Sequence, residues 1–231
     1  MKKLDNQIFQ DRRKSFLSKL DGKAAIIPGA KLVQHHADCE YPFRQESNFW
    51  YLTGFDEPDA IALFLSHKPM GERYILFVHP KNIESEVWNG FRWGTNGAEK
   101  VFKADKSHPI SEFEKELPHY LMGADEIVFS VGKYPEIEPI VLNLWAKQID
   151  NYSRIGRAPR AIQAPGMFLN QMRLIKSQYE IERMREAVLI SAEAHELVKL
   201  NIRSKNNEKQ IQGLLEGFFL EKGTRGPAYN S

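Results

Sequence analysis

The sequence predicts an α/β domain followed by a segment built only of helices. Up to about residue 150, short apolar runs typical of buried strands alternate with amphipathic helical patterns. The stretch 151–165 interrupts this alternation with prolines, small residues and arginines. After it, only helical periodicity remains. We therefore expect an α/β domain over 1–150, a linker over 151–165 and the incomplete start of a second domain over 166–231.

The elements of the first domain follow from apolar spacing and turn residues. Phe9 and Leu20 belong to an apolar stripe that ends before Gly22, so a helix is expected over 5–20. A helix is expected to open with a capping box at Ser111, and another amphipathic helix covers 137–145. Short apolar or alternating runs predict strands over 24–27, 60–65, 74–78 and 126–131.

The segment after residue 165 carries at least two amphipathic helices. Ser177 and Glu180 have the spacing of a capping box, which predicts a helix start. Another helix is expected from Asn207, with apolar residues at helical spacing over 211–219. Two or three such helices cannot bury their apolar faces on one another, so we expect the 211–219 face to lack a covering layer in this chain.

Composition excludes several classes of protein. The 231 residues are 42% hydrophobic and 27% charged, which is a globular composition. A net charge of +2 gives no reason to expect a nucleic-acid partner. The single Cys39 rules out an internal disulfide and a Cys-rich zinc module. No run reaches the roughly 20 apolar residues of a membrane span, and no apolar signal core follows the charged residues 1–5, so we expect a cytoplasmic protein without membrane contact.

Self-contained catalytic motifs are missing from the sequence. It has no glycine-rich dinucleotide loop, no Walker loop and no G-x-S-x-G element. His195 and Glu196 begin like a zinc-binding H-E-x-x-H helix, but Lys199 stands where the second histidine is needed. The run 35–40 holds His, Asp, Cys and Glu, yet adjacent ligands converge poorly on a metal, so we expect a polar loop. The basic run 11–14 is expected to form the solvated face of the first helix.

One aromatic-rich stretch is more specific. The run YPFRQESNFWYLTGFDEP over 41–58 packs aromatic side chains around Arg, Gln and Asn, and read alone it predicts a core-packing helix with its cap. It also closely resembles the N-terminal domain of Xaa-Pro aminopeptidases (aminopeptidase P) of the creatinase/prolidase group. Three further runs resemble the same family in the same order: EVWNGFR over 86–92, MRLIKS over 172–177 and PAYN over 227–230.

The resemblance implies a fold and an activity. The fold would be a mixed sheet with flanking helices, followed by the first helices of a truncated α+β "pita-bread" catalytic domain. The activity would be release of the first residue from peptides with proline second, by an enzyme that holds two Mn²⁺ ions. The resemblance also implies a proline-containing peptide as substrate and a homo-oligomer, dimer or tetramer.

The sequence departs from the family pattern at its metal site. The two Asp, one His and two Glu that hold the metals in the family lie beyond the PAYN run. After Asp150 the chain has no Asp, and His195 is its only His there. We therefore expect no catalytic residue and no metal ligand in this chain, and we expect the fragment alone to be inactive.

One functional residue carries over from the resemblance. Trp88 matches a family tryptophan that reaches the active site of a neighbouring subunit and helps to wall the substrate pocket, a task suited to a planar apolar side chain. The alternative is that Trp88 only packs its own loop. Trp93 is a weaker candidate, because the family pattern has no tryptophan there.

Two other functions stay open. One is a non-catalytic, peptidase-like binding module, since such modules lack metal ligands. The other is a sister activity such as prolidase or creatinase. The sequence of the 41–58 run is typical of the aminopeptidase branch and so disfavours this alternative.

Overall fold

The computed structural model describes residues 6–205, 207–229 and 231. Residues 1–5, in which no signal core is expected, and Asn230 of the fourth motif lie outside the described residues. The chain divides into two compact units, one that ends at Met172 and one that begins at Arg173. The first unit contains the sheet, and the second contains only helices.

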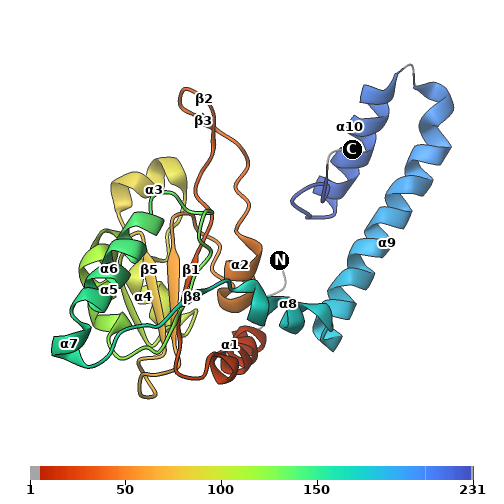
Figure 1. Cartoon of the computed structure of the whole chain (residues 1–231). Helices are drawn as coiled ribbons and strands as arrows, with labels where there is room; N and C mark the ends of the chain where they lie inside the picture. The colour runs from red at the N-terminus through yellow and green to blue at the C-terminus, as the bar shows by residue number, and fades with distance from the viewer. Residues whose placement is uncertain (1–5, 206, 230) are drawn as a thin grey trace. The chain divides into compact units, whose positions relative to one another are not determined.

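A six-stranded mixed sheet forms the centre of the first unit (Figure 1). Its strand order is β6-β5-β4-β1-β7-β8. The strands are β1 (Ala24–Pro28), β4 (Ile61–Leu65), β5 (Tyr74–Val78), β6 (Lys106–Pro109), β7 (Ile127–Val128) and β8 (Ile162–Gln163). Strand β4 is antiparallel to both neighbours, and every other pair is parallel. The carboxyl ends of the five other strands therefore lie along one edge of the sheet.

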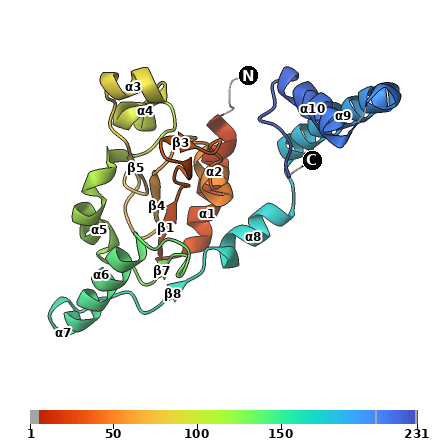
Figure 2. The ribbon, with the colours of Figure 1, turned by 90° about the horizontal axis from the view of Figure 1, so that it is seen from above.

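Helices cover both faces of the sheet, as Figure 2 shows. The central strands are buried on both sides, which explains why they read as continuous apolar runs. One face packs against α1 (Asn6–Leu20), α2 (Ser47–Thr53), α4 (Gly94–Lys100) and α8 (Gly166–Leu174). The other packs against α5 (Phe113–Leu121) and α6 (Glu138–Asp150). The α/β prediction and the strands predicted over 24–27, 60–65 and 74–78 are confirmed, whereas the strand predicted over 126–131 is shorter and covers only Ile127–Val128.

Several short elements were not predicted from the sequence. Strand β6 is half-buried and carries little apolar pattern. The segment 151–165, expected to be a linker, contains α7 (Tyr152–Ile155) and strand β8, which pairs with β7. A two-residue edge strand leaves too short a pattern to detect. Helix α5 is entered through a 3₁₀ turn, η1 (Ile110–Glu112), without a side-chain cap, so the capping box expected at Ser111 is wrong.

The expectation that the basic run 11–14 forms a solvated helix face is wrong for two of its residues. Arg12 and Arg13 are buried in the first unit, with Arg13 only 5% exposed, so this part of the run is not a solvated face. Their guanidinium groups donate to the carbonyls of Tyr51 and Leu52 at 3.2 and 3.0 Å. Those carbonyls lie at the end of α2, where intrahelical partners run out. The planar guanidinium groups satisfy these carbonyls. The sequence shows only that the two residues are charged, so it does not reveal that they are buried.

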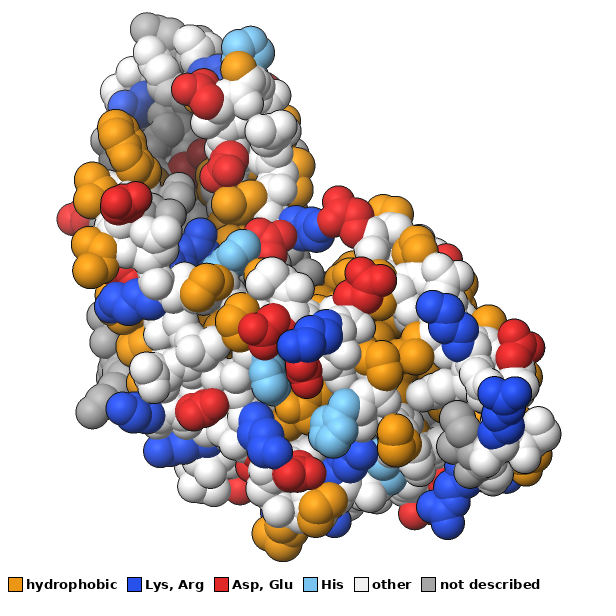
Figure 3. All heavy atoms as spheres, turned by 90° about the vertical axis from the view of Figure 1, so that its left-hand side faces the viewer, with side chains coloured by type: hydrophobic (Ala, Val, Ile, Leu, Met, Phe, Trp, Pro, Cys, Tyr) orange, Lys and Arg blue, Asp and Glu red, His pale blue; other side chains and the backbone are white. Residues whose placement is uncertain are grey.

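Surface charge is mixed on the face that Figure 3 shows. Lys and Arg side chains there are interspersed with Asp and Glu side chains among the described residues. Such a surface has no extended basic stripe of the kind that follows a phosphate backbone.

The second unit consists of α9 (Gln178–Asn201), the 3₁₀ turn η2 (Ile202–Ser204) and α10 (Glu208–Glu221). The capping box at Ser177 is confirmed, with reciprocal bonds between Ser177 and Glu180. The two helices contact each other, and Lys222 bridges to Glu193 at 2.6 Å. The 211–219 face of α10 is partly covered, but none of the described residues of α10 is fully buried. None of the described helices is long and apolar enough to span a membrane.

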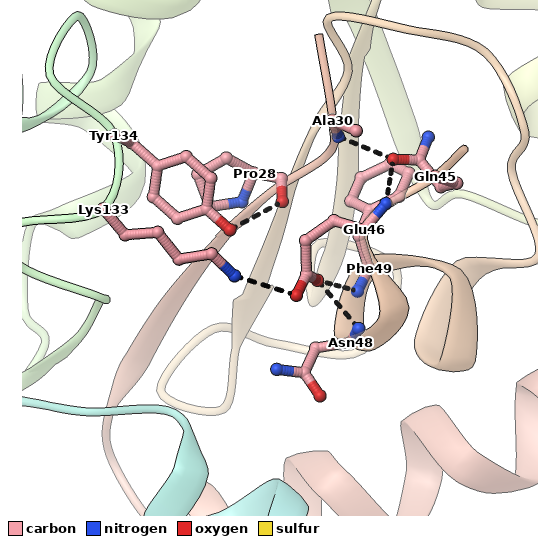
Figure 4. A network of polar contacts seen from close by, with 8 residues as sticks. All are labelled: Pro28, Ala30, Gln45, Glu46, Asn48, Phe49, Lys133 and Tyr134. Atoms are coloured by element: carbon pink, nitrogen blue, oxygen red, sulfur yellow. Dashed lines mark hydrogen bonds and ion pairs between the residues drawn. The ribbon is translucent and has the colours of Figure 1, made fainter. Parts of the chain in front are cut away.

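One buried amide holds together the segment around α2. Gln45 is 7% exposed. Its Oε1 accepts hydrogen bonds from the backbone N–H groups of Ala30 at 2.6 Å and Glu46 at 2.8 Å (Figure 4). Its Nε2 donates to the carbonyls of Phe55 at 3.3 Å and Glu57 at 2.8 Å. One side chain thereby joins the end of β1, the entry to α2 and the exit from α2.

The next residue, Glu46, caps α2 and ties it to the connection between β7 and α6. Oε2 of Glu46 accepts from the backbone N–H groups of Asn48 and Phe49 at 2.7 and 2.8 Å. Its Oε1 pairs with Nζ of Lys133 at 3.0 Å (Figure 4). A carboxylate at the start of a helix satisfies otherwise unpaired N–H groups and interacts well with the helix dipole.

Replacing Gln45 by alanine is expected to destabilise the chain by roughly 3 kcal/mol, because buried backbone groups lose their partners. Urea unfolding followed by circular dichroism measures the change. Gln34→Ala, at an exposed position of the β2 strand (Gln34–His36), serves as the matched control and is expected to change little. Equal stabilities of the two variants would contradict the role assigned to Gln45.

Candidate functional site

Two of the motifs recognised in the sequence meet in space. The run 41–58 contains α2 and, a few residues after it, Glu57. The run 86–92 lies in the connection between β5 and α4. This connection, residues 79–93, contains helix α3 (Ile83–Asn89), which lies beside α4 in Figure 2. The backbone N–H of Trp93 donates to Oε1 of Glu57 at 2.6 Å. Residues 79–93 are called the α3 loop below.

Glu57 is a buried acid, 7% exposed. Burial raises the pKa of its carboxyl, against the opposing effects of the Trp93 N–H bond and of the nearby Arg92 and His79. Its second oxygen, Oε2, has no hydrogen-bond partner among the described residues. A buried carboxylate with one bonded oxygen is costly, which points to a specific task rather than to general stability.

The α3 loop is also closed from within. Oε1 of Glu86 accepts from the backbone N–H of Arg92 at 3.2 Å and lies 3.6 Å from Nζ of Lys81. The same Lys81 ammonium lies over the ring of Phe91, 4.5 Å from its centroid. These contacts join the two ends of α3 to each other, so the helix and its flanks form a small unit of their own.

The structure separates the two candidate tryptophans. Trp88 lies on α3 and is 87% exposed. With Ile83, Val87 and Phe91, which are also exposed, it makes a set that we call the α3 apolar surface. Trp93 is 38% exposed, and its ring packs edge-on against Phe91 and Phe102. Trp93 thus packs part of its ring against its neighbours, whereas the Trp88 side chain is almost completely exposed.

Half of the six aromatic residues of the run 41–58 belong to the core. Phe49, Tyr51 and Phe55 are buried, whereas Tyr41 is exposed and Trp50 packs edge-on against Phe9 at the surface. The interpretation of this run as a core-packing helix with its cap therefore holds for α2 and the residue that follows its end, but not for the exposed start of the run. What it missed is Glu57, since a buried acid and an exposed acid look alike in a sequence.

A cavity of about 260 Å³ opens at the carboxyl edge of the parallel strands. This is the edge at which open α/β sheets commonly bind ligands. The charged residues that line it include Lys31, Asp59 and Glu136. Lys31 and Glu136 form an ion pair, and Asp59 pairs with His79 at 3.2 Å. Lys31 and Glu136 thus already satisfy each other within the cavity.

The remaining sequence candidates lie on the surface. The run 35–40 forms an exposed hairpin of β2 and β3 (Cys39–Glu40). His195 lies on α9, where its Nδ1 contacts the carbonyl of Ser191 at 2.7 Å, and Lys199 pairs with Glu196. In the part of the chain that the structure describes, no three His, Cys, Asp or Glu side chains are placed to hold a metal ion together.

The raised pKa of Glu57 gives stability a specific dependence on pH. The folded state holds its proton to higher pH than the unfolded state, so Glu57 makes the protein less stable as pH rises from about 4 through its folded pKa. Glu57→Gln is expected to remove this part of the decline in unfolding free energy. Urea unfolding at a series of pH values measures it, with Glu40→Gln, an exposed position, as the control for loss of one negative charge. Parallel profiles for Glu57→Gln and the unmodified chain would contradict the prediction.

Comparison with known proteins agrees with this arrangement. A family model described as "Aminopeptidase P, N-terminal domain" matches residues 9–129. Xaa-Pro aminopeptidases of Escherichia coli and Haemophilus influenzae are each 32% identical over the whole chain, which spans 53% and 51% of their lengths. The intermediate cleaving peptidase 55 of Saccharomyces cerevisiae is 27% identical over 96% of the chain, which covers 44% of that protein. The chain thus spans about half the length of the curated relatives it matches.

Solved structures give the same result. Zinc-substituted E. coli aminopeptidase P in complex with product superposes with a TM-score of 0.91 at 32% identity, over 99% of this chain and 52% of that one. The aminopeptidase PepP of Pseudomonas aeruginosa superposes with a TM-score of 0.88 at 30% identity, with the same coverage. The predicted fold, a mixed sheet with flanking helices as in the aminopeptidase P N-terminal domain, is confirmed. Because the family model matches more than half of the sequence, the chain belongs to the family of the aminopeptidase P N-terminal domain.

Proposed function

We propose that this chain is the N-terminal part of an Xaa-Pro aminopeptidase, which releases the first residue from peptides with proline second. The observation that carries the proposal is 32% identity over the whole chain to proteins of that name, together with the shared fold. In this reading residues 1–150 form the accessory domain and residues 166–231 begin a pita-bread catalytic domain. The connection 151–165 adds α7 and β8 to the accessory domain.

The metal chemistry of such an enzyme would lie outside these 231 residues. The described residues bring together no group that fits two manganese ions or any other metal pair. One relative has been studied in zinc-substituted form, which supports a metal-dependent reaction for that protein. We propose that the ligands follow the present sequence and that this part of the enzyme, taken alone, does not hydrolyse peptides.

Trp88 is proposed as a substrate-binding residue that acts in a neighbouring subunit. Its ring is almost completely exposed and lies in the α3 apolar surface, so its own fold does not account for it. A flat apolar wall suits a proline ring, which offers few hydrogen-bonding groups. This role requires a homo-oligomer, a dimer or a tetramer. We further propose a cytoplasmic enzyme that acts on proline-containing peptides.

Hydrolysis of Arg-Pro-Pro tests the proposed activity. The full-length gene product with Mn²⁺ is expected to release arginine, and the 231-residue chain is expected to release none above a chelator-treated control. Release by the 231-residue chain would place the site inside it. A full-length protein that cleaves only Xaa-Pro dipeptides would instead be a prolidase, and an inactive one that binds peptides would be a non-catalytic module.

Trp88→Ala in the full-length enzyme is expected to raise KM for Arg-Pro-Pro roughly tenfold, because apolar contact area with the proline ring is lost. The value of kcat is expected to change less, since Trp88 would touch the substrate and not the reacting atoms. Steady-state kinetics measure both constants. Met70→Ala, at an equally exposed position on a turn, is the matched control. An unchanged KM in Trp88→Ala would remove Trp88 from the binding site.

A further inference from the structure

Both ends of the α3 loop are held by one short segment, Glu57-Pro58-Asp59. At the first end, Nε2 of His79 lies 3.2 Å from Oδ2 of Asp59. At the second end, the backbone N–H of Trp93 donates to Oε1 of Glu57 at 2.6 Å. Residues 57–59 are called the anchor segment below.

The anchor segment is itself firmly attached to the sheet. The carbonyl of Glu57 accepts from the buried Gln45 amide at 2.8 Å. The backbone N–H of Asp59 donates to the carbonyl of Ala30, just after β1, at 2.9 Å. Pro58 restricts the backbone between the two acids. A displacement of this segment would therefore break hydrogen bonds to the end of β1 and to Gln45.

The backbone of the anchor segment carries strain. Asp59 has φ of 58°, in the left-handed region that residues other than glycine, asparagine and aspartate rarely adopt. Such a conformation persists where its surroundings hold it, and it is found disproportionately at sites with a function. At this residue Oδ2 lies beside Nε2 of His79, while Oε1 of Glu57 accepts from the Trp93 N–H.

Between its two anchored ends the α3 loop exposes much of its side-chain surface. Ile83, Val87 and Trp88 are each more than three-quarters exposed. The internal contacts of Glu86 hold the loop together but do not attach it to the sheet. The position of Trp88 relative to the sheet therefore depends strongly on the two anchors.

We propose that Glu57 and Asp59 are positioning residues for Trp88: they fix where the α3 loop presents its apolar surface and so control substrate affinity without touching substrate. The inference rests on the proposed role of Trp88 in peptide binding. It explains why an acid is buried with only one oxygen bonded at this place, and why a non-glycine residue adopts a left-handed conformation two positions later.

The test compares Glu57→Ala with Glu57→Gln in the full-length enzyme. The alanine variant removes the acceptor for the Trp93 N–H, whereas the glutamine variant retains an oxygen at that place. Glu57→Ala is expected to raise KM for Arg-Pro-Pro about tenfold with kcat within about twofold, as expected when a contact is misplaced but the chemistry is intact. Glu57→Gln is expected to restore most of the affinity.

A double variant shows whether Glu57 acts through Trp88. If it does, Glu57→Ala adds no further increase in KM once Trp88 is already alanine, because residues that act as one unit are non-additive. An additive increase in the double variant would overturn the inference. Asp59→Ala provides a second variant at the other anchor should Glu57→Ala fold poorly, and it is expected to show the same non-additivity.

Hydrogen exchange separates failure of this inference from failure of the proposed function. Amides of residues 79–93 are expected to exchange faster in Glu57→Ala, while those of β1 and β4 remain as protected as in the unmodified enzyme. Unchanged exchange in the α3 loop, or faster exchange throughout the sheet, would overturn the positioning role. Faster exchange in the loop with KM unchanged in both Glu57→Ala and Trp88→Ala would support anchoring but refute the binding role of Trp88.

Discussion

The hydrogen bonds of the buried Gln45 amide are the interaction on which the arrangement of β1, α2 and the anchor segment depends. Backbone groups that leave a strand or a helix inside the protein need partners, since an unpaired one costs as much as a lost hydrogen bond. Gln45 supplies partners to four such groups at once, at Ala30, Glu46, Phe55 and Glu57. The end of β1 and both ends of α2 are therefore fixed relative to one another. The anchor segment, which begins at Glu57, is fixed with them.

Polar groups elsewhere in the unit work by the same rule. Arg12 and Arg13 reach from α1 to the last carbonyls of α2, and Glu46 satisfies its first N–H groups. Helix α2 is only seven residues long, too short to be stable alone, so side chains at both ends must complete it. The motif over 41–58 thus combines core aromatics with the polar residues that a short, buried helix needs.

Regular elements with a strong pattern were predictable, and irregular ones were not. The strands β1, β4 and β5 and the helices α1, α6 and α9 were found because burial imposes a period on the sequence. Strands β6 and β8 lie at the two edges of the sheet and carry little pattern. Arg12 and Arg13 were misjudged as solvated because charge predicts exposure on average, and the carbonyls that bury them belong to a segment 39 residues away.

The local pattern of residues was enough to establish the α/β class, the helical segment after it, the family resemblance and Trp88 as a candidate. These predictions depend on hydrophobic periodicity and on the residues of the motifs, and both can be read from a linear sequence. Only the folded chain decided that Trp88 is almost completely exposed while Trp93 packs partly against Phe91 and Phe102, and that Glu57 is buried against the loop that carries both tryptophans. Burial and hydrogen-bond partners arise from contacts between distant segments, because the free energy of a polar group depends on what surrounds it and not on its neighbours in the chain.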